Sequence, residues 1–76
     1  MSERLPVLKA REVVRILERA GFFIHHQSGS HVQMKHNQRP DLRITIPAHS
    51  GDLPKTVLRS ILKQAQLTVD EFNALR

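Results

Sequence analysis

The sequence predicts an α+β fold of the order α-β-β-β-α: a three-stranded antiparallel sheet, two helices packed on one of its faces, and a short C-terminal helix. Three observations predict it. Apolar residues recur with a helical period towards each end, three segments between them alternate polar and apolar residues, and loop-forming residues separate these segments. The 76 residues leave room for one domain over residues 1–76. A chain of this size buries only ~60% of its unfolded surface, so we expect any active site to be a shallow surface patch.

The first predicted helix covers residues 9–20 and follows an extended arm over residues 1–8. Its apolar residues are spaced i, i+3, i+4, i+7 and i+10, as on one face of an α-helix. Gly21 stands where a helix end favours a residue with positive φ. The apolar stripe consists of Ala10, Val13, Val14, Leu17 and Ala20.

Three strands are predicted over residues 22–27, 31–36 and 42–46, with turns between them and Pro47 ending the last. The alternation in the second and third strands indicates one packed and one solvated face. The core face carries Val32, Met34, Leu42, Ile44 and Ile46. The solvent face carries His31, Gln33, Lys35, Arg43 and Thr45.

The register of the first strand has two solutions, because a slip of one residue exchanges its faces. A two-residue loop places His26 beside His31 but leaves Phe22 and Ile24 on the solvent face. A three-residue loop buries Phe22 and Ile24 and brings His25 to the side of His31. Burial of the two large apolar side chains favours the three-residue loop.

The second predicted helix covers residues 53–65, with Asp52 as N-cap and Pro54 in the first turn. A capping-box pattern that begins at Thr68 predicts a short third helix ending at Leu75. The apolar stripe of the second helix consists of Val57, Leu58, Ile61, Leu62 and Ala65.

The charge distribution favours a polyanion as partner. Twelve Lys and Arg stand against seven Asp and Glu, a net charge of +5 with neutral histidines. Such a field attracts nucleic acid, an acidic protein or an anionic membrane surface. Lys55, Arg59 and Lys63 form one stripe of the second helix, whose N-terminus suits a phosphate, unless the stripe is an ordinary solvated face. Lys35 and Arg43 lie on the open sheet face, which has no acidic residue.

The chain contains no cysteine, which excludes disulfides, cysteine-ligated zinc and thiol nucleophiles. It shows no signal-peptide pattern and no apolar stretch near the ~20 residues that a membrane span needs. We therefore expect a cytoplasmic protein with no membrane partner.

Among the histidines, His31 is the strongest candidate for a catalytic residue. It follows Gly29 and Ser30 at the start of a strand, and an imidazole titrates near neutral pH. It can take a proton from an RNA 2′-OH or return one to the leaving 5′-oxygen, or it is a hairpin histidine without a chemical role. A metal site is the other interpretation of so many imidazoles, but no helix carries a His pair at i, i+4, so we expect no metal and no cofactor. The five histidines are His25, His26, His31, His36 and His49.

Four segments together resemble a known family: residues 18–22 (ERAGF), 29–34 (GSHVQM), 44–47 (ITIP) and 52–65 (DLPKTVLRSILKQA). From about residue 9 to residue 72 the chain resembles the HicA toxins, also called YcfA-like proteins, which are small mRNA interferases of bacterial and archaeal toxin–antitoxin pairs. It departs from the family pattern at His26, where Arg is frequent, and at Gln66, where Gly is frequent.

The resemblance implies a double-stranded-RNA-binding-domain-like fold and metal-independent cleavage of mRNA, with His31 as the catalytic residue. It also implies a HicB-type antitoxin that covers the active face. We expect Gly29 and Ser30 to shape the site, and no DNA binding by the chain alone. The residues expected to bind RNA phosphates are Lys35, Arg43, Lys55, Arg59 and Lys63.

Two questions stay open at this point. The second proton-transfer group is either His25 or His26. The chain is alternatively a non-catalytic RNA-binding module of the same fold, or an interaction protein whose basic face only docks an antitoxin. RNA cleavage in the presence of EDTA separates the enzyme from both alternatives.

Overall fold

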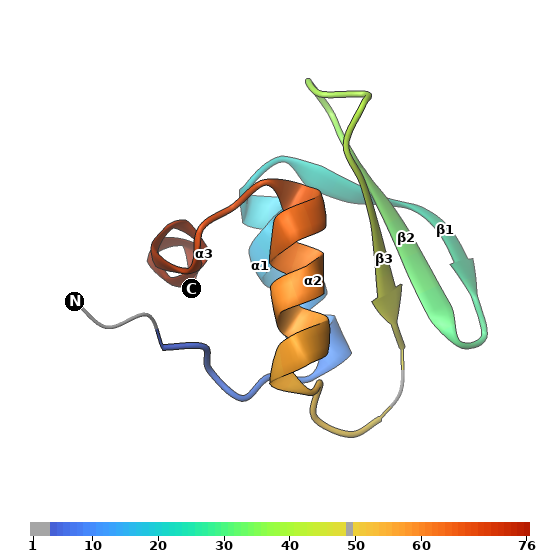
Figure 1. Ribbon diagram of the computed structural model, residues 1–76. Coiled ribbons are helices and arrows are strands. Elements are labelled where there is room, and N and C mark those ends of the chain that lie inside the picture. Colours follow the sequence, from blue (N-terminus) through green and yellow to red (C-terminus); the bar gives the residue numbers. More distant parts are fainter. Residues whose placement is uncertain (1–3, 49) are drawn as a thin grey trace.

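The computed structural model describes residues 4–48 and 50–76. Along the chain follow helix α1 (Ala10–Arg19), strands β1 (Phe22–Ser28), β2 (His31–His36) and β3 (Arg43–Pro47), and helices α2 (Lys55–Ala65) and α3 (Val69–Leu75). The strands form one antiparallel sheet of order β1-β2-β3. Helices α1 and α2 cover one face of this sheet, and α3 lies on their far side (Figure 1). The predicted α+β class and double-stranded-RNA-binding-domain-like order are confirmed, with element ends within one or two residues of those predicted.

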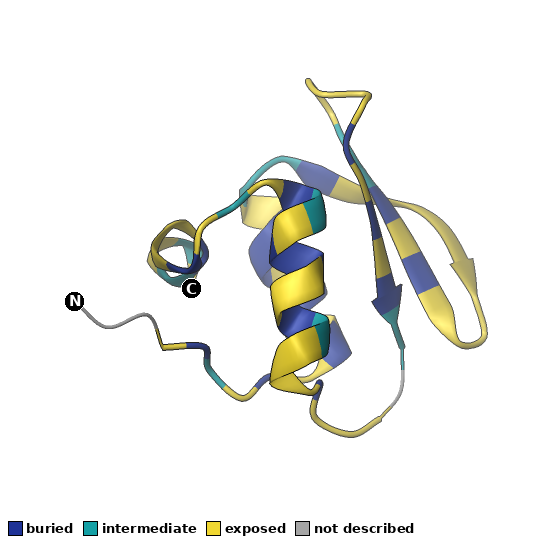
Figure 2. Ribbon diagram, viewed as in Figure 1, coloured by how far each residue is buried: buried dark blue, intermediate teal, exposed yellow. Residues whose placement is uncertain are grey.

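The hydrophobic core lies between the sheet and the helices α1 and α2. Along β2 and β3 buried and exposed residues alternate, as Figure 2 shows. The residues predicted for the core face are all buried: Val32, Met34, Leu42, Ile44 and Ile46. The N-terminal segment adds two side chains to the same core, Leu5 and Leu8, so residues 4–8 pack as part of the fold. No helix or strand among the described residues covers the other face of the sheet, which we call the open face (Figure 1).

Helix α1 ends at a glycine, as predicted. Gly21 has φ +98°, and a Cβ at this position would lie 2.8 Å from Nε2 of His36. The His36 ring is held on both nitrogens: Nε2–H donates to the Ala20 carbonyl (2.8 Å), and Nδ1 accepts from the Gln38 backbone N–H (3.0 Å). Because a carbonyl only accepts and a backbone N–H only donates, these bonds fix the neutral Nε2–H tautomer. The ring also packs edge-on against Phe22, with centroids 4.8 Å apart, so His36 is a structural residue.

The predicted start of α2 is wrong. Asp52 does not cap the helix; Pro54 occupies the N-cap position. Asp52 instead forms a β-bridge with Lys9, and their side chains approach to 3.8 Å. The backbone N–H of Leu53 donates to the Leu8 carbonyl (2.8 Å). Residues 52–53 are therefore held against the N-terminal segment, and the helix begins only at Lys55.

The link between α2 and α3 begins with a left-handed residue at the end of α2 and ends with a capping box at the start of α3. Gln66 closes α2 in the left-handed region, with φ 58°. Thr68 forms the predicted capping box: its Oγ1 accepts from the Glu71 N–H (3.0 Å), and the Glu71 carboxylate accepts from the Thr68 N–H (2.8 Å). The short α3 then buries Phe72 completely. The third helix is thus confirmed, with its cap.

Candidate active site on the open face of the sheet

A β-bulge in β1 decides which side chains reach the open face. Ile24 lies opposite Met34, and His26 lies opposite Gln33, so His25 is the extra residue between the two pairs. Directly opposed residues of neighbouring strands point to the same face of a sheet. Ile24 therefore points to the core face with Met34, whereas His26 points to the open face with Gln33. The extra residue lets β1 change faces in mid-strand.

The bulge reconciles two registers that looked exclusive in the sequence. Ser28 pairs directly with His31, and the connecting loop contains only Gly29 and Ser30. The expected three-residue loop is therefore wrong. Its main consequence still holds, because Phe22 is buried.

The expected burial of Ile24 is also wrong. Its side chain stays 42% exposed although it points to the core face. It lines an apolar hollow of about 520 Å³ between α1 and the β1–β2 hairpin, together with Ala10, Val14 and Val32. The helix does not reach far enough over the hairpin to cover this position.

The open face carries three cross-strand rows of side chains, successive rows lying about 7 Å apart along the strands. The first row is Ser28, His31 and Pro47; the second is His26, Gln33 and Thr45; the third is Phe23, Lys35 and Arg43. None of these side chains is acidic. The open face therefore combines imidazoles with cations, as predicted from the sequence.

His31 is exposed at the start of β2, and its Nδ1 lies 3.0 Å from the Ser30 hydroxyl oxygen. This hydrogen bond orients the ring and leaves Nε2 for a substrate. Gly29 stands in the exposed turn, has no positive φ, and a Cβ there would meet no atom within 4 Å. Ser30 therefore contacts the catalytic candidate, while Gly29 contributes only to the turn.

A shallow hollow of about 300 Å³ lies between His31 and helix α2. Its polar wall includes Thr45 of the sheet and three α2 residues spaced four apart: Thr56, Ser60 and Gln64. The Gln64 amide oxygen accepts the Thr45 backbone N–H (3.0 Å), which holds α2 against the outer edge of β3. These residues were missed in the sequence, although their i, i+4, i+8 spacing is visible there.

A second hollow, about 210 Å³ and mainly polar, lies over the middle of the sheet. Lys35 and Arg43 oppose each other across β2 and β3 and contribute to its wall. His25, Gln33 and Thr45 line it as well. Because Thr45 belongs to both hollows, they adjoin at β3. Two cations and an imidazole around a small polar hollow suit an anionic group such as a phosphate.

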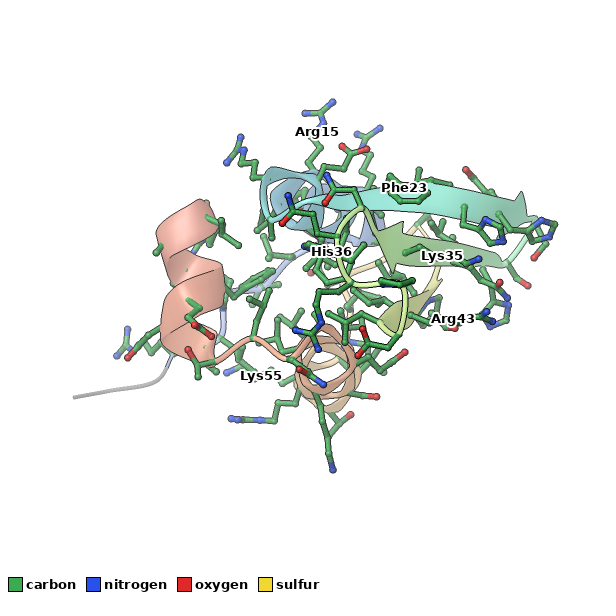
Figure 3. The ribbon with its side chains drawn as sticks, turned by 90° about the horizontal axis from the view of Figure 1, so that it is seen from above. Arg15, Phe23, Lys35, His36, Arg43 and Lys55 are labelled. Carbon is green, nitrogen blue, oxygen red and sulfur yellow. The ribbon has the colours of Figure 1, made fainter. Side chains whose placement is uncertain are left out.

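The cations of α2 do not join His31. Lys55, Arg59 and Lys63 are exposed, but each precedes a residue of the hollow by one position, a turn of about 100° around the helix. In Figure 3, Lys35 and Arg43 extend from the open face, and Lys55 lies beside α2 away from both. The predicted cations thus form two separate groups.

One arginine near the face is neutralised. Arg39 donates two hydrogen bonds to the Asp41 carboxylate, from Nε (3.2 Å) and Nη2 (3.1 Å). These bonds lower the pKa of Asp41 below its ordinary value and raise that of Arg39. Both groups are charged at neutral pH, so their charges largely cancel and leave Lys35 and Arg43 to dominate this part of the face.

Among residues 4–48 and 50–76, no three His, Asp or Glu side chains gather as a metal-binding group. His49 lies outside these residues. Within the same described part of the chain, no helix has the length and apolar character for crossing a membrane.

Comparison with protein families matches residues 10–67 to the family described as the HicA toxin of bacterial toxin–antitoxin systems. The match runs from the start of α1 past the end of α2 and contains every residue of the open face. No curated protein sequence matches the chain significantly. Toxins of such systems have a cognate antitoxin as partner. Since the match covers more than half of the sequence, the chain belongs to the HicA toxin family.

Proposed function

We propose that this toxin is a metal-independent endoribonuclease that cleaves mRNA, with His31 as an acid–base residue. One observation carries the proposal: an exposed imidazole, oriented by Ser30, borders a hollow that adjoins another walled by Lys35 and Arg43. An imidazole beside a phosphate-binding surface can supply the proton transfer that RNA cleavage needs without a metal ion.

The reaction is a transesterification within the RNA. A base removes the proton of the 2′-OH, the 2′-oxygen forms a bond to phosphorus, and the bond from phosphorus to the 5′-oxygen breaks. The leaving 5′-oxygen takes a proton, which gives a 2′,3′-cyclic phosphate and a 5′-hydroxyl. Imidazole acts in such proton transfers with a typical gain of ~10²–10⁴ in rate. The charges of Lys35 and Arg43 would stabilise the negative charge that develops on the phosphate.

The rest of the surface would bind the substrate. Thr56 and Ser60 offer hydroxyl groups beside His31, and the cations of α2 would contact phosphates further along the strand: Lys55, Arg59 and Lys63. DNA lacks the 2′-OH that the reaction consumes and is not a substrate. A HicB-type antitoxin with an acidic surface would cover the open face and silence the toxin in the cytoplasm.

The test is the incubation of purified protein with mRNA in the presence of EDTA, with wild type beside His31→Ala. We expect EDTA-resistant cleavage that falls at least ~10²-fold in the variant. A circular dichroism melt should show the same fold for both, because His31 is exposed. Undiminished cleavage by His31→Ala would refute the assignment.

The same experiment distinguishes the enzyme from a non-catalytic RNA-binding module. The two groups of cations are also compatible with that second function. That function predicts salt-dependent RNA binding without cleavage products in wild type. An RNA with a 2′-deoxynucleotide at the cleavage site must resist the enzyme, and its cleavage would exclude attack by the 2′-oxygen.

A further inference from the structure

We infer that His25 is the second proton-transfer group of the site. This inference rests on the proposed ribonuclease activity, which needs both a base and an acid. His25 is the residue that the bulge adds to β1, and it lines the polar hollow together with Lys35 and Arg43. A phosphate held there by the two cations would therefore lie beside His25.

The arrangement of the rows would place the two imidazoles on either side of a phosphodiester that binds to the open face. His31 stands in the first row, and His25 stands at the bulge beside the second row, next to Gln33. Thr45 belongs to both the hollow of His31 and the hollow of His25. A scissile phosphate above Gln33 and Thr45 would thus have one imidazole towards each end.

His26 is the rival for this role, since it also points to the open face opposite Gln33. The polar hollow separates the two: its wall contains His25, whereas His26 lines none of the three hollows described above. His25 therefore faces the cations that hold the phosphate, and His26 lies outside the hollow.

The proton balance of the reaction is complete with two imidazoles. One is neutral and takes the proton of the 2′-OH, and the other is protonated and gives its proton to the 5′-oxygen as the phosphorus–oxygen bond breaks. No oxidant, reductant or further reactant is consumed. The charged and titratable groups around His25 are Lys35 and Arg43 across the hollow and the neighbouring His26; Gln33 and Thr45, the remaining polar groups, do not titrate.

The test compares the pH dependence of kcat at saturating RNA for wild type, His25→Gln and the matched control His26→Gln. Glutamine keeps a polar side chain of similar reach but does not titrate. A site with one acid and one base gives a bell-shaped profile. For wild type and His26→Gln we expect a bell-shaped pH profile of kcat. For His25→Gln we expect a kcat reduced ~10²-fold and a pH profile with only one limb.

Two outcomes overturn the inference. If the pH profile of kcat for His25→Gln keeps both limbs, whatever the size of kcat, then His25 only binds or positions RNA. Loss of a limb in His26→Gln alone would assign the proton transfer to His26. In both outcomes cleavage still depends on His31, so the proposed function stands. If wild type fails to cleave, or His31→Ala cleaves as well as wild type, the proposed function fails and the inference fails with it.

Discussion

At the residue scale, glycine and histidine act together at the end of α1. Gly21 takes the left-handed conformation that lets the chain leave the helix, and His36 then bonds to the carbonyl of Ala20. The contact is close because Gly21 has no side chain. The same residue type has no such requirement at Gly29, where the surrounding space is open.

Gly21→Ala should reduce the free energy of unfolding by roughly 1–3 kcal/mol, since a side chain at this φ is strained. The new Cβ would also press on His36, 2.8 Å from Nε2. Urea denaturation followed by circular dichroism measures the loss. Gly29→Ala is the matched control and should change stability by less than ~0.5 kcal/mol. Equal losses in the two variants would contradict this account.

Much of the fold, but less of the site, follows from residue patterns in the sequence. The core residues of β2 and β3 were predicted because alternation is a local signal that each strand carries by itself. The bulge at His25 is defined by pairing with β2, and no local pattern distinguishes an extra residue from a regular one. The position of Asp52 likewise depends on its bridge to Lys9, a contact between distant parts of the chain.

At the element scale, α2 connects the core to the candidate site. One side of the helix is buried, another presents Thr56, Ser60 and Gln64 to His31, and Gln64 joins it to β3. Its C-terminus is closed by Gln66, a residue with φ 58°. HicA toxins frequently have Gly at this position. The left-handed backbone of Gln66 gives a physical reason for that preference.

Gln66→Gly should raise the free energy of unfolding by about 0.5–1 kcal/mol, because glycine adopts the left-handed region without strain. The substitution removes one long hydrogen bond, from Arg39 to the Gln66 side chain (3.4 Å), which lies on the surface. Thermal and urea denaturation report the change. A decrease in stability would show that the Gln66 side chain contributes more than its backbone strain costs.

At the scale of the whole molecule, the five cations predicted to bind RNA are divided between two surfaces. Lys35 and Arg43 lie on the open face, and the remaining predicted cations follow α2. RNA that contacts both surfaces must pass from the sheet over the hollow beside His31. The salt dependence of binding reports how many of these cations contact phosphates.

Binding of single-stranded RNA, measured in the His31→Ala background to prevent cleavage, should weaken linearly with the logarithm of salt concentration. Lys35→Ala and Lys55→Ala should each reduce the slope by about 0.7, the value for one lost phosphate contact. Arg39→Ala is the control and should leave the slope unchanged, because Asp41 already neutralises Arg39. An unchanged slope for Lys55→Ala would remove α2 from the RNA path.

The bulge in β1 also has a consequence for the length of the chain. If His25 were deleted, Ile24 would still lie opposite Met34 and His26 opposite Gln33, now as consecutive residues of a regular ladder. A chain shorter by this residue would therefore keep every strand pair and lose one imidazole from the hollow. In an alignment, the difference would read as a single-residue gap inside a strand, a position where gaps are usually taken for alignment errors.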